Sequence, residues 1–190
     1  INNNLTIQFG HGKHFIGNGY RSLILSDNTF SYPFLRLQTN LGIFRYTNLY
    51  TEFMDIRNNQ LSIIDGYQGW SRKYMSLHFL ECEINDRIKI GVFESIIYAE
   101  NHAPGVSSLD INYLNPIIFY RPVEYSLGSP DNALIGIDLK FNTSKNQFLY
   151  AQFILDEFTL EEMKSNNGYW ANKYGYQIGY KFLDFLDVIG

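Results

Sequence analysis

The chain has 190 residues and a formal net charge of −4, and 18% of its residues are charged while 17% are aromatic. An acidic chain of this kind gives no support to nucleic-acid binding, which usually shows a basic patch. The single cysteine, Cys82, excludes an internal disulfide framework and a cysteine-rich metal site. Few charges and many aromatic side chains are instead typical of a strand wall that turns one face to lipid and carries aromatic girdles at its rims.

A glycine-rich segment over residues 10–28 is the most distinctive stretch of the chain. Residues 9–28 hold four glycines, two histidines, one lysine and one arginine, and they follow a short alternating stretch from Leu5 to Gly10. Glycine permits a positive φ angle or a close approach to another surface. We therefore expect a shaped polar loop that a β-barrel wall holds inside the barrel or across its mouth.

The next two strands are expected over residues 35–40 and 44–53, with a short turn at Leu41-Gly42 between them. A bulge near Thr47 would keep Leu49 and Phe53 on the same face as Phe44, because one extra residue restores the alternation. A polar loop is then expected over residues 57–73.

The middle of the chain predicts one hairpin and the longest irregular segment. A strand begins near Met75, and a slip in its alternation near Leu80 places Glu81 and Glu83 on the polar face with His78. A turn at residues 85–87 leads into a returning strand over 88–92. Residues 99–131 carry four of the five prolines, and a short helix fits within 108–115. Irregular segments of this length are usually functional or disordered, and on a barrel they form outer loops or lumen plugs.

Clean alternation near the C-terminus predicts strands over residues 133–142, 149–156 and 173–182, with a turn at 143–146 and a loop over 157–167. Short connections therefore alternate with long ones along the whole chain. Outer-membrane barrels show this pattern because their periplasmic turns are short and their outer loops are long. We expect an all-β, antiparallel up-and-down meander of roughly eight strands that forms part of a transmembrane outer-membrane β-barrel.

The segment Gly10-His11-Gly12-Lys13-His14-Phe15-Ile16-Gly17-Asn18-Gly19-Tyr20-Arg21-Ser22-Leu23-Ile24-Leu25-Ser26-Asp27 resembles the N-terminal motif of the capsule assembly Wzi family, which includes gliding-motility outer-membrane proteins of Bacteroidetes. Residues 32–37, 44–50, 93–95 and 149–153 fit the same family. The resemblance implies a non-enzymatic protein of the bacterial outer membrane that contacts lipid, attaches or organises surface polysaccharide, or supports gliding. Members of the family are larger barrels, so residues 1–190 would form a single partial β-barrel domain.

The candidate contacts to a glycan or to the lumen are mostly cations and carboxylates at the expected loop and wall positions: Lys13, His14, Arg21, Asp27, Arg45 and Glu94. Polar residues of the long middle segment, Asn112, Asn115 and Arg121, extend this set. We expect no catalytic residue, no metal and no cofactor.

Other chemistries remain as alternatives. The glycine run would cradle a phosphate only between a strand and a helix of a parallel sheet. A metal site would have to combine the four histidines, His11, His14, His78 and His102. Glycoside hydrolysis would need two carboxylates at a defined separation, from among Glu81, Glu83, Glu94 and Asp156. Ser76 and His78 share one strand face but lie about 7 Å apart, too far for direct activation of the serine.

Two non-enzymatic alternatives use the same residues differently. The chain could be a structural subunit of an envelope secretion or motility complex, in which the long loops contact proteins. It could also be a soluble carbohydrate-binding β-sandwich. Aromatic rows such as Tyr174, Tyr176 and Tyr180 could stack on sugars, but such rows are more often membrane girdles or wall packing.

Overall fold

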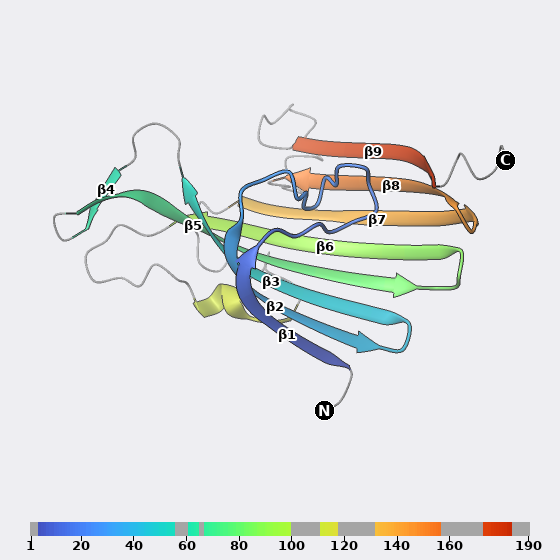
Figure 1. Cartoon of the computed structure of the whole chain (residues 1–190), viewed down its shortest axis with the longest axis horizontal. Helices are drawn as coiled ribbons and strands as arrows, with labels where there is room; N and C mark the ends of the chain where they lie inside the picture. The colour runs from blue at the N-terminus through green and yellow to red at the C-terminus, as the bar shows by residue number, and fades with distance from the viewer. Residues whose placement is uncertain are drawn as a thin grey trace, which may run out of the picture.

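The computed structural model describes residues 4–55, 61–64, 67–99, 111–117, 132–156 and 173–183. They form one antiparallel sheet (Figure 1). Its strands are β1 (Leu5–Gly12), β2 (Tyr32–Leu41), β3 (Phe44–Asp55), β4 (Leu61–Ile64), β5 (Tyr67–Glu83), β6 (Ile88–Ala99), β7 (Asn132–Ser144), β8 (Gln147–Asp156) and β9 (Lys173–Phe182). Eight strands follow one another as β1-β2-β3-β5-β6-β7-β8-β9, and β4 pairs with the start of β5.

The all-β antiparallel meander expected from the alternation is confirmed. Each of the edge strands, β1 and β9, has one strand partner in the described part of the chain, so the sheet is open there. The one helical element in these ranges is the 3-10 helix η1 (Ile111–Leu114), inside the segment where a short helix was expected. Within the same ranges, no helix is long and apolar enough to cross a membrane.

The three short turns lie where the sequence places them, and they gather at one end of the sheet, on the right in Figure 1. They connect β2 to β3, β5 to β6, and β7 to β8. Gly42 in the first turn has a φ of 59°, a left-handed value that favours glycine. The side-chain oxygen of Asn85 in the second turn accepts hydrogen bonds from the backbone N–H groups of Arg87 and Ile88, both at 2.9 Å.

Two predicted irregularities in the alternation are wrong. The pairing of β3 with β2 and β5 is continuous through Thr47, without a bulge. The pairing of β5 is equally continuous through Leu80, so Glu81 stays on the face of Leu77 and opposite that of His78. Both predictions assumed that apolar residues gather on one outward face. The central strands instead turn Leu49 and Leu77 toward a covered face, where they are fully buried.

The polar loop expected over residues 57–73 is also corrected. Strand β4 pairs with the start of β5 through a register from Leu61 opposite Trp70 to Ile64 opposite Tyr67. The segment therefore contains a strand pair, because the backbone groups of residues 61–64 and 67–70 bond to one another. Of the expected segment 99–131, the structure describes residues 99 and 111–117, and the expected loop 157–167 lies outside the described residues.

The two faces of the sheet differ in what covers them. Residues 13–31, here called the strap, leave β1, cross the sheet toward β7 and β8 and return to β2 (Figure 1). We call the side on which they lie the strap face. A hydrophobic core fills the space between the strap and the central strands, and its buried members are Ile24, Leu49, Met75, Leu77, Phe79 and Phe93. The strap thus supplies the second layer that a sheet needs to bury one face.

The opposite face is covered only at its centre in the described part of the chain. The Tyr46 and Tyr50 hydroxyl groups donate hydrogen bonds to the carbonyl oxygens of Pro116 (2.9 Å) and Leu114 (3.1 Å), which fixes residues 111–117 on this face. Tyr113 is buried there in a cluster with residues of β5, β6 and β7. On the flanking strands this face exposes large apolar side chains: Leu5, Ile7, Phe9, Ile135, Ile137, Leu139, Phe141, Leu149, Phe153, Tyr174, Tyr176, Ile178 and Tyr180.

Candidate functional site beneath the strap

A buried polar network fixes the strap to the sheet. Asp138 on β7 accepts hydrogen bonds from the backbone N–H of Asn18 (3.0 Å) and from the Gln152 side-chain amide (2.7 Å). The same amide of Gln152 donates to the Ser22 hydroxyl at 3.0 Å, and its oxygen accepts from the backbone N–H of Leu23 at 2.9 Å. Both Asp138 and Gln152 are almost fully buried. Because buried polar groups are costly unless paired, this network holds the strap in one position.

Glycine is required where the strap approaches the network. Gly17 has a φ of 104°, and a Cβ atom built there would lie 2.3 Å from the Gln152 amide nitrogen and 2.5 Å from the Ser22 hydroxyl. Any side chain would therefore be strained by the backbone angle and would collide with the anchoring groups. Gly17 and Gly19 thus allow the strap to approach the sheet closely.

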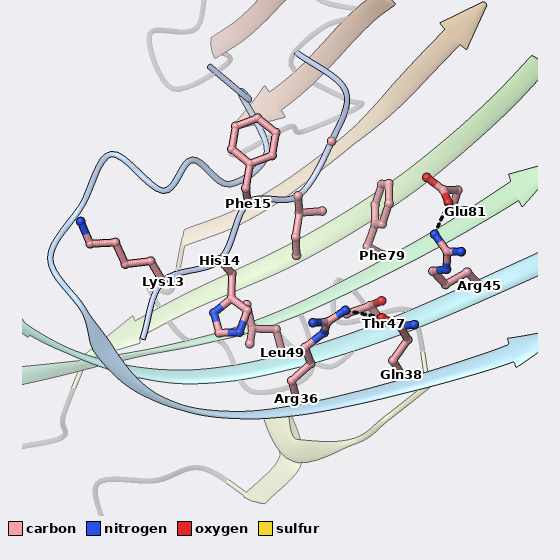
Figure 2. Close-up of a pocket in the computed structure, with 12 residues that line it drawn as sticks. Lys13, His14, Phe15, Arg36, Gln38, Arg45, Thr47, Leu49, Phe79 and Glu81 are labelled. Carbon is pink, nitrogen blue, oxygen red and sulfur yellow. Dashed lines mark hydrogen bonds and ion pairs between the residues drawn. The ribbon is translucent and has the colours of Figure 1, made fainter. Parts of the chain in front are cut away.

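A cavity of about 400 Å³ opens between the start of the strap and strands β2, β3 and β5 (Figure 2). The strap contributes residues 13–17, and the strands contribute residues that alternate onto the strap face. The full lining is Lys13, His14, Phe15, Ile16, Gly17, Arg36, Gln38, Arg45, Thr47, Leu49, Phe79 and Glu81. The volume lies in the range of small-molecule sites, which combine apolar walls with a few placed polar groups.

The charge of this cavity is positive although the chain as a whole is acidic. Three cations, Lys13, Arg36 and Arg45, meet one carboxylate, Glu81. Arg45 uses that carboxylate, because its Nη1 atom lies 3.0 Å from Glu81 Oε1. Arg36 donates instead to two neutral amide oxygens, those of Gln8 (3.2 Å) and Gln38. The described residues thus leave the guanidinium charge of Arg36 without a carboxylate partner.

His14 forms the boundary between the cavity and an aromatic wall. Its ring lies edge-on to Phe34, with centroids 4.2 Å apart, and its Nδ1 atom lies 3.3 Å from the Tyr32 hydroxyl. Burial, with the neighbouring charge of Arg36 as a smaller cause, lowers the pKa of His14 below its usual value of 6.5. The imidazole is therefore neutral at pH 7 and can take part in hydrogen bonds without adding charge.

The structure brings together three of the six candidate residues and separates the other three. Lys13, His14 and Arg45 line the cavity. Arg21 and Asp27 are exposed on the strap and lie outside this lining. Glu94 is buried on the opposite face of the sheet, where its carboxylate lies 3.2 Å from His78 Nδ1.

The additional middle-segment candidates do not reach the cavity either. Asn112 and Asn115 belong to the segment that contacts the opposite face of the sheet, and neither lines the cavity. Arg121 lies outside the described residues. The strand residues Arg36 and Gln38 were not among the candidate contacts, and Glu81 was a candidate only as a carboxylate for glycoside hydrolysis. The alternation of Arg36 and Gln38 along β2 was the signal that could have identified these two, because it places both on one face.

The described part of the chain assembles no metal, phosphate-loop or serine-histidine site of the kinds considered above. Its His, Cys, Asp and Glu side chains form no group of three or more that could hold a metal ion, and His102 lies outside it. Glu81 and Glu83 pair with Arg45 and Lys89, while Glu94 lies on the other face of the sheet. The glycine run leads into an antiparallel sheet and not into the helix that a phosphate-binding loop needs. Ser76 and His78 are both buried on the opposite face.

No family model matches the chain, and no curated protein and no solved structure matches it either.

Proposed function

We propose that this chain forms part of the wall of an outer-membrane β-barrel and that it attaches or organises surface polysaccharide, in capsule assembly or in gliding motility. This is the role implied by the resemblance of residues 10–27 to the capsule assembly Wzi family. The observation that carries the proposal is that one sheet has two different faces. Its flanking strands expose apolar side chains on one side, and its other side holds a polar, cation-lined cavity.

The membrane part of the proposal depends on strands β7 to β9. Their opposite face exposes a continuous set of large apolar residues, among which Tyr174, Tyr176 and Ile178 are 71%, 71% and 74% exposed. Contiguous apolar surfaces of this kind mark contacts with lipid or with another protein. In a transmembrane barrel such a row faces hydrocarbon, and the tyrosines belong to an aromatic girdle near the headgroups.

The polysaccharide part depends on the cavity beneath the strap. Sugars are bound by side chains that exchange hydrogen bonds with hydroxyl groups and by apolar faces that pack on the ring. Gln38 and Thr47 supply the first kind of group, and Phe15 and Phe79 supply the second. A cavity of this kind in a barrel wall would bind one sugar unit of a polysaccharide that extends outward from the cell.

A comparison of cells with and without the native protein tests this function. We expect the protein in the outer-membrane fraction and extractable only with detergent. Cells that lack the protein should release into the medium the polysaccharide that wild-type cells retain on their surface. The total amount of polysaccharide that they synthesise should not change. Equal retention in both strains would remove the polysaccharide role. If the protein also copurified with other envelope proteins from detergent extracts, the chain would be a structural subunit of a secretion or motility complex.

A further inference from the structure

The cavity beneath the strap has a charge that a neutral sugar does not need. Three cations face one carboxylate, and that carboxylate already forms an ion pair with Arg45. Bringing like charges together without enough counter-charge is unfavourable unless something anionic enters. His14, which also lines the cavity, is neutral at pH 7, so it adds a hydrogen-bonding group but no charge.

Arg36 is the residue best placed to receive that anion. It projects from β2 into the cavity beside His14 and Gln38 (Figure 2). Arginine has five N–H donors, and the described residues use two of them, both on neutral amide oxygens. The two amides fix the plane of the guanidinium group and leave its charge uncompensated. A planar guanidinium held in this way matches a carboxylate through two parallel hydrogen bonds.

The rest of the lining favours a ring attached to the anion over a free ion. A free anion needs only donors, yet Phe15 and Phe79 contribute apolar surface to the same cavity, and the fully buried Leu49 lies behind that surface. Phe79 and Leu49 are buried members of the core, so this wall is rigid. The Thr47 hydroxyl and the Gln38 amide lie on neighbouring strands opposite one another in the register. The Cβ atoms of residues directly opposite in an antiparallel pair lie about 4.5–5.5 Å apart, a spacing that suits two hydroxyl groups on one edge of a small ring.

We propose that this cavity binds an acidic saccharide unit, a pyranose that carries a carboxylate, and that Arg36 is the residue that selects the carboxylate. The inference rests on the proposed polysaccharide function and specifies its ligand class. Lys13 at the rim of the cavity adds long-range attraction, and Arg45 with Glu81 forms its far wall. A neutral polysaccharide would leave the charge of Arg36 uncompensated and would bind more weakly.

Isothermal titration of the detergent-solubilised native protein with tetragalacturonate tests the inference. The fully methyl-esterified tetrasaccharide is the neutral comparison ligand. We expect the acid to bind at least about tenfold more tightly than the ester, because only the acid forms the charged hydrogen bonds. Arg36→Gln should remove this preference, and Arg36→Lys, which keeps the charge but not the planar fork, should retain part of it. Arg21→Gln removes the same charge from an exposed part of the strap outside the cavity lining, so it should change nothing.

The possible failures point to different errors. Equal binding of acid and ester would overturn the selection of a carboxylate and leave the polysaccharide function intact. Inorganic phosphate that displaces the saccharide at equal concentration would overturn the saccharide and identify a simple anion site. Undiminished acid preference in Arg36→Gln would overturn the assignment of Arg36. Absence of binding by both saccharides would overturn the inference, and the cellular retention experiment would then decide the proposed function separately. Should Arg36→Gln not fold, Arg36→Lys and Arg45→Gln still test whether cavity cations set the preference.

Discussion

The central strands and the flanking strands of this sheet both alternate, but they direct their apolar side chains to opposite faces of the sheet. A single register row on the opposite face passes through Asn48, His78 and Glu94 on the central strands and continues as Ile135 and Leu155 on β7 and β8. The polar members of this row are buried on a part of the sheet that is covered by residues 111–117, whereas Ile135 is 37% exposed. The row changes from polar to apolar where the cover ends.

This difference shows that the alternation of polar and apolar residues along a strand depends on what covers each face of the sheet, and not only on whether one face contacts lipid. At the centre, the strap makes the strap face the apolar one, and Leu49, Leu77 and Phe93 form its core. On the flanks, the strap face carries Asp138 and Gln152, and the apolar residues turn outward. We therefore restrict the proposed barrel wall to the flanking strands, because the centre is packed like the interior of a layered domain.

The largest expected difference comes from truncating one apolar side chain in each region. Leu77→Ala should lower the free energy of unfolding by about 2–5 kcal/mol, because Leu77 is fully buried beneath the strap. Ile178→Ala should change it by less than about 0.5 kcal/mol, because Ile178 is 74% exposed on β9. Urea unfolding of both variants in the same detergent measures the two changes. Equal losses would show that the two regions are packed alike and would break the comparison.

A lysine at the same flanking position tests what that face contacts. In phospholipid vesicles, Ile178→Lys should cost about 2–4 kcal/mol if the residue lies near the bilayer midplane, since a charge there must leave water. Tyr20→Lys is the matched control, because Tyr20 is an equally exposed aromatic residue on the strap. Folding yield and unfolding free energy in vesicles are the measurements. A similar small cost for both variants would mean that β9 does not face lipid.

The strand pattern was sufficient to predict most of the fold. The strand over residues 173–182 was predicted with the bounds of β9, because Tyr174 to Phe182 alternate without interruption. The bulge at Thr47 and the slip at Leu80 were wrong, because the sequence alone could not show that the strap covers the central strands. Local alternation gives the two faces of a strand, but the element that covers each face comes from a distant part of the chain.

Loss of Asp138, which anchors the strap to the sheet, should give the next largest loss of stability. Asp138→Ala leaves the Asn18 backbone N–H and the Gln152 amide without their buried acceptor. Each hydrogen bond to a charged group contributes about 1.5–3 kcal/mol, so losing these bonds should cost at least about 1.5 kcal/mol. The strap should also open locally, and trypsin should cut after Arg21 faster than in the wild type. Asp27→Ala, which removes an exposed carboxylate from the same strap, should leave both the stability and the cleavage rate unchanged.

The candidate site was predicted in part for the same reason. Lys13 and His14 stood out because cations interrupt a glycine run, and the structure places both in the cavity. Arg36 did not stand out, because a single arginine on an alternating strand is ordinary. The sequence left the face of Glu94 open, because the direction of its side chain depends on the register of β6 with β5, which sets it beside His78 and away from the strap.

The smallest expected effect is a pH dependence that originates in the strap. The pKa of His14 lies below 6.5 in the folded protein because of burial and Arg36, so the unfolded chain binds more protons as the pH falls through that value. The stabilisation is complete above about pH 6.5 and is lost progressively toward the lowered folded-state pKa. His14→Gln can still accept a hydrogen bond from Tyr32 but does not titrate, so its melting temperature should fall less between about pH 7.5 and about pH 5.5 than that of the wild type. Because His78 and the other histidines remain in both proteins, the difference between the two profiles isolates His14. Superimposable profiles would mean that the imidazole is freely solvated, and the wall that it forms between the cavity and Phe34 would then be absent in solution.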